Sequence, residues 1–132
     1  MKKNGILNSN LAKLVDDLGH TDQVCIGDLG LPVPNHVQKI DLAVIPGKPS
    51  FQELIDVYLE NVVVEKIILA EEIKTVNPTQ LETLLAKLGK EVQVEFVSHE
   101  ELKQLNRSVK AIIRTGENTP YSNVILQSGV TI

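Results

Sequence analysis

The stretch EKIILA, residues 65–70, decides the fold class of this sequence. It forms an apolar run, without the alternation of apolar and polar residues that marks a half-exposed strand. Such a run is expected for a β-strand that is buried on both faces, as in a parallel sheet covered by helices on each side. The chain on either side of residues 65–70 should therefore carry helix signals.

Helix signals do flank this strand. Before it, Ser50 and Glu53 have the spacing of a capping box, which predicts a helix start. After it, Asn77 is expected to cap a second helix, with Pro78 in its first turn and Gly89 at its end. The apolar face of this second helix consists of Leu81, Leu84, Leu85 and Leu88.

The alternation of helix and strand patterns continues toward the N-terminus. Apolar residues at helical spacing predict a helix over residues 11–18, with Gly19 as its stop. Residues 23–27 are expected to form a short strand that ends at Asp28, and residues 39–44 a second strand. A loop that contains two prolines separates these strands.

Toward the C-terminus, residues 92–96 alternate as a further strand. Ser98 and Glu101 repeat the capping-box spacing at the start of a short helix. Residues 110–114 and 124–126 are expected to be the last strands.

This order of elements predicts an α/β fold. We expect a single domain over residues 1–132, with three layers, α/β/α, around a largely parallel, mixed sheet. In open sheets of this kind, ligands bind beyond the carboxyl ends of the strands. Polar residues next to the predicted strands are therefore the candidates for chemistry.

Composition and charge exclude several classes of function. The 132 residues carry a net charge of −4, with no basic run beyond Lys2 and Lys3, so the clustered cations of a nucleic-acid-binding surface are missing. No apolar stretch approaches the roughly 20 residues that cross a bilayer, and the polar residues near the start argue against a signal peptide. One cysteine, Cys25, forms no internal disulfide, which suits a reducing compartment. We expect a cytoplasmic protein that binds neither nucleic acid nor membrane.

Two histidines are candidates for acid–base chemistry. His20 directly follows Gly19, and it either complements a helix dipole at the surface or acts as a general acid or base. His99 lies in the first turn of the helix after Ser98, where it is either an incidental exposed residue or a neutral hydrogen-bonding group for a polar ligand. The residues alone leave both alternatives open.

Three further polar residues lie beside predicted strands. Asp28 either satisfies its own backbone in a turn, or orients an imidazole or binds sugar hydroxyls. Tyr121 and Asn123 precede the last strand; they are either a core-edge ring and a turn residue, or contacts to a polyol. Each of the three thus has a structural and a functional interpretation.

Several common catalytic centres do not fit the spacing of these residues. The histidines and the lone cysteine have no metal-ligand spacing, so neither a metal site nor a metal is expected. Residues 27–32, GDLGLP, lack the third glycine of a dinucleotide fingerprint and the helix that would face a phosphate. Ser98 has no nucleophile-elbow context, and the chain has no Walker loop.

Short motifs in a characteristic order span nearly the whole chain. The first are Leu7-Asn8-Ser9, Leu18-Gly19-His20-Thr21-Asp22, Asp28 with Gly30-Leu31-Pro32 and Pro34, Ile40-Asp41-Leu42, Gly47, Pro49 and Phe51. The others are Ala70-Glu71-Glu72-Ile73-Lys74, Ser98-His99-Glu100, Ile113-Arg114-Thr115-Gly116-Glu117, Thr119-Pro120-Tyr121, Asn123 and Ile125-Leu126. Together they resemble the D-ribose pyranase family, which includes the related L-fucose mutarotases. The similarity is greater to the ribose pyranases.

The resemblance implies conversion of β-D-ribopyranose to β-D-ribofuranose, without cofactor or metal, as a supply of ribose to its kinase. It implies that His20 is the catalytic acid. It also implies that the sugar is bound by Asp28, His99, Tyr121 and Asn123. Members of this family form ring-shaped homo-oligomers, typically decamers, with sites near the subunit contacts.

Ring interchange requires one proton delivered to the ring oxygen and one removed from the anomeric hydroxyl. We expect His20 to exchange the proton at the ring oxygen, with Asp28 holding it or an adjacent hydroxyl. Leu29 replaces a smaller residue of the family next to Asp28, which would alter packing at the mouth of the site. Two alternatives remain open: a non-catalytic ribose-binding module, and a mutarotase that acts on L-fucose.

Overall fold

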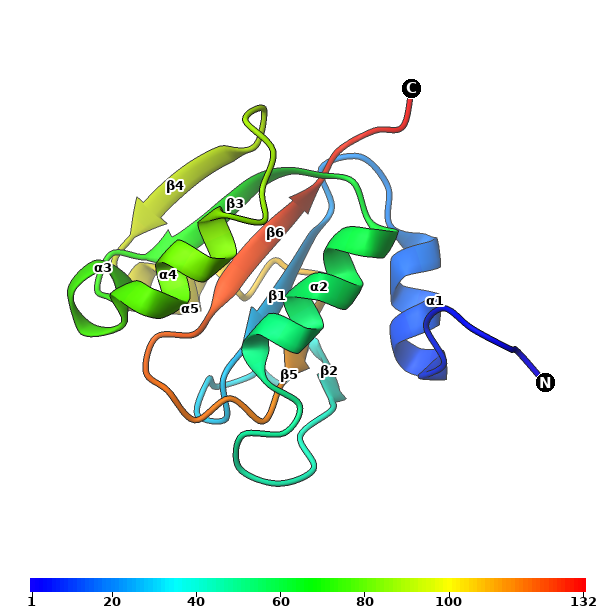
Figure 1. Cartoon of the computed structure of the whole chain (residues 1–132), viewed down its shortest axis with the longest axis horizontal. Helices are drawn as coiled ribbons and strands as arrows, with labels where there is room; N and C mark the ends of the chain where they lie inside the picture. The colour runs from blue at the N-terminus through cyan, green and yellow to red at the C-terminus, as the bar shows by residue number, and fades with distance from the viewer.

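The computed structural model describes residues 1–132 and contains a six-stranded β-sheet with the strand order β2-β5-β1-β6-β3-β4 (Figure 1). The strands are β1 (Gln23–Gly27), β2 (Gln38–Asp41), β3 (Val64–Ala70), β4 (Gln93–Val97), β5 (Ala111–Arg114) and β6 (Val124–Ser128). The helices are α1 (Ser9–Asp17), α2 (Phe51–Asn61), α3 (Ile73–Val76), α4 (Pro78–Leu85) and α5 (His99–Leu105). The predicted α/β fold is confirmed.

The sheet is mixed, as expected. β1 and β2 each pair in parallel with β5, and β3 pairs in parallel with β4. β6 lies between β1 and β3 and is antiparallel to both. One reversed strand therefore joins two parallel blocks, and the start of β6 lies at the edge of the sheet where the other strands end (Figure 1).

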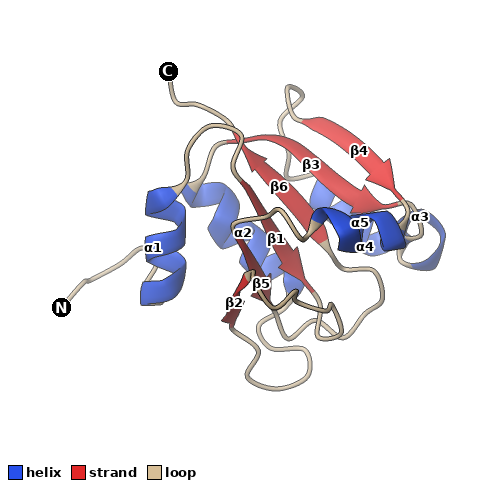
Figure 2. Cartoon of the chain, turned by 180° about the vertical axis from the view of Figure 1, so that it is seen from behind, coloured by secondary structure: helices blue, strands red, loops and turns tan.

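Helices cover the two faces of the sheet unequally. α1, α2 and α4 lie on one face, over a cluster of 20 buried residues that includes Ile26, Leu69 and Phe51 (Figure 1). The other face carries α5 and the loop after β1, over a cluster of 9 buried residues that includes Cys25 and Leu102 (Figure 2). Burial raises the pKa of the Cys25 thiol to about 12, so this cysteine is a core residue and not a nucleophile. No helix in either layer is long and apolar enough to span a membrane.

The predicted signals at the starts of α2 and α4 have different outcomes. The capping box forms at α2: Ser50 Oγ accepts from the N–H of Glu53, and the Glu53 carboxylate accepts from the N–H of Ser50. Asn77 occupies the N-cap position of α4, but its side chain makes no capping hydrogen bond. The Asn77 amide donates instead to Thr119 and to the carbonyl of Pro120. The predicted side-chain cap was wrong, because a distant loop competes for the same amide.

At α5 only half of the predicted capping box forms. Ser98 Oγ accepts from the N–H of Glu101 at 3.1 Å. The backbone N–H of His99, in the first turn, donates to the carboxylate of Glu72. Glu72, which precedes α3, therefore binds a free N–H in the first turn of α5, and this N–H is not the one that Glu101 would accept from in a capping box.

Several element boundaries also differ from the prediction. β2 ends at Asp41 and not at residue 44, because the Asp41 carboxylate accepts from the N–H of Ala43 and turns the chain away from β5. The structure also contains the one-turn helix α3 between β3 and α4, where the sequence pattern predicts no helix.

A β-bulge interrupts the pairing of β3 with β6. Val64 pairs with Ser128 and Lys66 pairs with Gln127, which leaves Glu65 as an extra residue on β3. Bulges of this kind re-aim a side chain and are frequent next to functional sites. The direction of the Glu65 side chain is therefore not set by the alternation of the strand.

Candidate active site

Four of the predicted site residues gather at one edge of the sheet. Asp28 follows β1 and His99 follows β4, while Tyr121 and Asn123 immediately precede β6. Because β6 runs against its neighbours, its leading residues lie at the edge where the parallel strands end (Figure 1). The reversed strand is thus what assembles the cluster.

Asp28 and Asn123 are directly bonded, although 95 positions separate them in the sequence. The backbone N–H of Asp28 donates to Oδ1 of Asn123 at 2.9 Å, and Asn123 is 1% exposed. A Cβ at Gly27 would lie 3.1 Å from this oxygen and 2.5 Å from the Leu31 side chain. The glycine at the end of β1 therefore leaves room for the amide.

The Asp28 carboxyl group is half-buried beside His99. Burial raises its pKa above the ordinary value of 3.8, while the Gly30 N–H, the Asn123 side chain and the charge of His99 oppose this rise. The Gly30 N–H donates to Asp28 Oδ1 at 3.0 Å. A half-buried carboxyl with a raised pKa in a cleft is a typical active-site group.

His99 is anchored through its backbone and presents its ring to the site. Its N–H donates to both carboxylate oxygens of Glu72, at 3.0 and 3.2 Å. The rings of His99 and Tyr121 pack in a T-shaped, edge-to-face arrangement, with centroids 5.2 Å apart and planes at 78°. Nδ1 of His99 is buried and has no hydrogen-bond partner. An unpaired buried nitrogen is costly, so a ligand hydroxyl would satisfy it.

Tyr121 lies in a loop that α4 holds in place. Its φ of 56° falls in the left-handed region, which is unusual for an aromatic residue. Gln80 Nε2 donates to Ser122 Oγ at 3.0 Å, and the Asn77 amide donates to the Pro120 carbonyl at 2.9 Å. Strained backbone persists where its surroundings determine it, and functional sites are where such strain clusters.

A hollow of about 340 Å³ opens beside this cluster. It is lined by Asp28, Leu29, Gly30, Glu117, Asn118, Thr119 and Pro120. The N–H of Leu29 donates to the carbonyl of Glu117 at 2.9 Å, which joins the two walls. Leu29, the residue that departs from the family pattern, therefore lies in the wall of this hollow.

His20 lies at the opposite edge of the sheet. It precedes β1 whereas Asp28 follows it, and five strand residues at about 3.3 Å each separate the two ends by roughly 16 Å. His20 lines a different hollow, of about 310 Å³, together with the C-terminal residues. One chain therefore brings together Asp28, His99, Tyr121 and Asn123, but it does not bring His20 to them.

An acidic residue binds the side chain of His20. Nε2 of His20 lies 2.8 Å from Oε1 of Glu65, and the other Glu65 oxygen accepts from Gln127 Nε2 at 2.7 Å. The Gln127 amide and then His20 lower the pKa of the Glu65 carboxyl. Neither Glu65 nor Glu72 was predicted as a site residue, because each meets its histidine through a long-range contact that no local motif signals.

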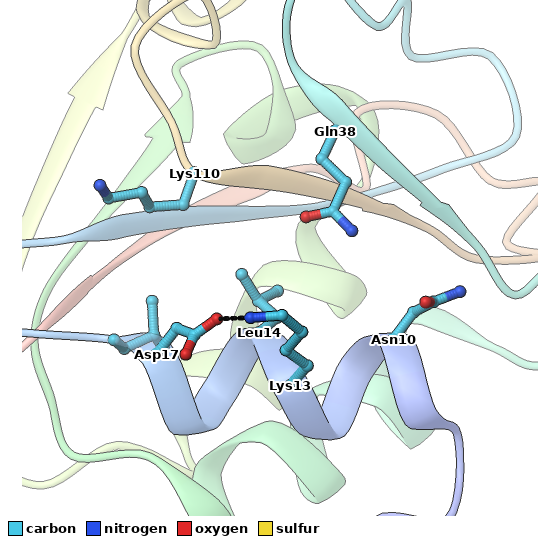
Figure 3. Close-up of a pocket in the computed structure, with 7 residues that line it drawn as sticks. Asn10, Lys13, Leu14, Asp17, Gln38 and Lys110 are labelled. Atoms are coloured by element: carbon cyan, nitrogen blue, oxygen red, sulfur yellow. Dashed lines mark hydrogen bonds and ion pairs between the residues drawn. The ribbon is translucent and has the colours of Figure 1, made fainter.

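Two other kinds of site are not supported by the geometry. A hollow of about 290 Å³ lies between α1 and the sheet, where Lys13 pairs with Asp17 while Gln38 and Lys110 extend from the strand side (Figure 3). None of the predicted site residues lines it, so we interpret it as a solvated polar groove. No three His, Cys, Asp or Glu side chains are placed to hold a metal ion.

The chain is similar to known proteins in sequence and in fold. The model of the RbsD / FucU transport protein family matches residues 1–131. A protein of Streptococcus agalactiae serotype Ia named D-ribose pyranase is 72% identical over 132 residues, which are 100% of each chain. The structure of Bacillus subtilis RbsD complexed with D-ribose has 54% identity and a TM-score of 0.94, with 100% of each chain covered. Fucose mutarotase of Streptococcus pneumoniae, solved in complex with L-fucose, has 20% identity and a TM-score of 0.76 over 96% of this chain and 95% of that chain, which shows the fold alone.

Proposed function

The chain belongs to the RbsD / FucU transport protein family, and from this membership we propose that it catalyses the D-ribose pyranase reaction, the interconversion of β-D-ribopyranose and β-D-ribofuranose. A relative of equal length carries that enzyme name, and a similar structure holds D-ribose. In this chain, the observation that carries the proposal is the polar cluster of Asp28, His99, Tyr121 and Asn123 at one edge of the sheet.

The reaction needs proton transfer, and neither a redox step nor a protein nucleophile. The hemiacetal opens when the ring oxygen gains a proton and the anomeric hydroxyl loses one. The freed chain then closes through a different hydroxyl. Positioned acid–base groups accelerate such steps by about 10²–10⁴-fold, so ordinary side chains suffice.

We assign the cluster to sugar binding. The Asp28 carboxylate accepts hydrogen bonds from sugar hydroxyls, and the unpaired Nδ1 of His99 forms a hydrogen bond with a further hydroxyl. Asn123 uses Oδ1 for the Asp28 backbone, which leaves its NH₂ group as a donor to the sugar. Tyr121 contributes its hydroxyl and the apolar face of its ring.

We further propose that His20, the catalytic acid, reaches this cluster from a second copy of the chain. Within one chain, β1 holds His20 and Asp28 at opposite edges of the sheet, farther apart than one pentose can bridge. The His20 side chain is 52% exposed, so a neighbouring copy can approach it. A shared site requires a homo-oligomer.

Exposed apolar side chains support such an assembly. Val44 and Ile45, in the loop between β2 and α2, are 79% and 59% exposed, and Leu7 near the N-terminus is 66% exposed. Burial between copies stabilises an assembly by roughly 1.5–3 kcal/mol for each such side chain. By resemblance to the family, we propose a decameric ring of one-domain chains that acts in the cytoplasm.

Saturation-transfer NMR on equilibrating D-ribose tests the reaction. Catalytic amounts of the protein should speed pyranose–furanose exchange, and His20→Ala should remove this effect. Ribose binding without faster exchange would replace the proposed enzyme by a binding module. L-fucose in the same assay measures the alternative substrate.

Mixing two inactive variants tests the shared site. His20→Ala and Asp28→Asn, refolded together in equal amounts, should recover activity, because about a quarter of the sites would then combine an intact His20 with an intact Asp28. Sites built within one chain would recover nothing, and that result would contradict the shared site.

A further inference from the structure

Glu65 occupies the β-bulge of β3, where the strand alternation does not dictate its direction. On one side of it, Val64 packs in the larger core cluster. On the other side, Lys66 forms an ion pair of 2.8 Å with Glu95 on β4. Glu65 neither packs in the core nor pairs with β4. Its side chain extends to the loop before β1, where it contacts His20.

A line of polar side chains across three strands holds Glu65. Gln23 on β1 donates from Nε2 to Oε1 of Gln127 on β6 at 3.0 Å. Gln127 donates from Nε2 to Oε2 of Glu65 at 2.7 Å. Oε1 of Glu65 then lies 2.8 Å from Nε2 of His20. One carboxylate oxygen is thus fixed by the sheet, and the other is available to the imidazole.

The backbone around His20 is fixed without Glu65. The N–H of Thr21 donates to the Ser128 carbonyl at 2.9 Å, and the N–H of Ser128 donates to the Asp22 carbonyl at 2.8 Å. The N–H of Gly19 donates to the Asp22 carboxylate at 2.9 Å. These bonds locate the main chain of His20 but leave its ring free to rotate. The bond to Glu65 is what orients the ring.

We propose that Glu65 is the positioning residue of the reaction: it holds Nε2 of His20 and leaves Nδ1 to exchange the proton with the sugar. This inference rests on the proposed function, in which His20 is the acid–base group.

The hydrogen-bond pattern determines which ring nitrogen carries the proton. Both oxygens of Glu65 are engaged, and the Gln127 amide followed by His20 lowers the pKa of the Glu65 carboxyl, so at neutral pH it is an ionised acceptor. Nε2 of His20 must then be the donor, and the lone pair of the neutral ring lies on Nδ1. In ring opening, Nδ1 takes the proton of the anomeric hydroxyl and delivers it to the ring oxygen, so His20 ends in the protonation state in which it began. The proton on Nε2 remains bonded to the ring and keeps its hydrogen bond to Glu65 throughout, so the ring keeps its orientation.

The test compares Glu65→Gln with Glu95→Gln. Both changes remove one negative charge from neighbouring strands, but Glu95 pairs with Lys66 and makes no hydrogen bond to His20. The dependence of exchange on D-ribose concentration gives kcat and KM, and selective isotope labelling of the three histidines gives the ring-nitrogen chemical shifts. His20→Ala assigns the signals of His20.

We expect Glu65→Gln to lower kcat about tenfold, a part of the 10²–10⁴-fold effect of a positioned acid–base group, with KM unchanged. The shifts of His20 should change from a ring protonated at Nε2 to a mixture of tautomers. Glu65→Asp, which keeps the carboxylate, should restore part of kcat, and Glu95→Gln should match the wild type in both measurements.

Wild-type kcat and wild-type ring-nitrogen shifts in Glu65→Gln would overturn the proposal. Equal losses in Glu65→Gln and Glu95→Gln would also overturn it, because a general charge effect would then explain both. A wild-type protein that does not speed exchange would overturn the proposed function instead. The ring-nitrogen shifts would still decide whether Glu65 sets the tautomer.

Discussion

Oδ1 of Asn123 accepts a hydrogen bond from the backbone N–H of Asp28 at 2.9 Å, and this bond extends the pairing of β1 with β6 beyond the ends of the two strands. Asn123 is buried and carries a candidate binding group, so the same side chain serves the fold and the site. Stability and sugar binding are therefore coupled at this position.

Asn123→Ala should destabilise the fold measurably. It leaves the N–H of Asp28 without its acceptor in a half-buried place, which costs about 1–3 kcal/mol. Asn118→Ala, in the exposed part of the same loop, should change the free energy of unfolding by less than about 0.5 kcal/mol. Urea unfolding measures both variants, and equal midpoints would contradict the role of the amide.

Asp28 should make the fold less stable as the pH rises above 3.8, the ordinary pKa of its carboxyl. Because burial raises the pKa of Asp28 in the folded state, the folded protein binds this proton more tightly than the unfolded chain does. The contribution of Asp28 to the free energy of unfolding is fully present below its unfolded-state pKa and is lost as the pH rises through its folded-state pKa.

Asp28→Asn should therefore be more stable than the wild type at neutral pH, and the difference should vanish below the unfolded-state pKa of Asp28. Urea unfolding of both proteins over a series of pH values measures this difference directly. Because other carboxyl groups titrate in both proteins, the comparison isolates Asp28. A difference that stays constant with pH would show that burial does not shift this carboxyl.

Tyr121→Phe should reduce catalysis without weakening the fold. It keeps the ring contact with His99 and deletes the hydroxyl. A lost hydrogen bond to the sugar is worth about 0.5–1.5 kcal/mol, so exchange should slow by about two- to tenfold. Tyr121→Ala removes the ring as well and should also lower the melting temperature. Wild-type exchange in Tyr121→Phe would remove the hydroxyl from the proposed site.

Gly116→Ala should disturb the loop before the site. A Cβ at Gly116 would overlap the backbone of Lys48, while the N–H of Gly116 donates to the Pro49 carbonyl at 2.8 Å. Overpacking of this kind costs about 1–3 kcal/mol. Gly19→Ala is the control, because its Cβ would have its nearest neighbour at 3.7 Å. A similar unfolding midpoint for the two variants in urea would contradict the predicted overlap.

The parts of the fold that follow from local rules could be predicted from the sequence. The capping box of Ser50 and Glu53 and the apolar run of residues 65–70 need no knowledge of the rest of the chain. The direction of β6 could not be predicted in this way, because an apolar strand pairs in either direction and its partners decide. The Asn77 side chain was mispredicted for a related reason, since its loop partners lie more than 40 positions away.

The resemblance to the family names the residues of the candidate site, whose roles stay predictions, but it does not say how the chain assembles them. The order of motifs pointed to Asp28, His99, Tyr121 and Asn123, and the structure places all four at one edge of the sheet. The expectation that His20 and Asp28 act on the same part of one sugar is not met within one chain. The distance between His20 and Asp28 could have been predicted from the sequence. One residue precedes β1 and the other follows it, and the two ends of a strand lie at opposite edges of a sheet.

The length of β1 has a consequence for how the protein behaves on dilution. The proposed acid lies at one end of this strand and the proposed sugar-binding groups lie at the other. Each chain therefore contributes the acid to one site and the binding groups to another. Each isolated chain would be folded yet unable to turn over sugar. Specific activity would then depend on protein concentration through mass action, and it would disappear on dilution while the secondary structure remained intact.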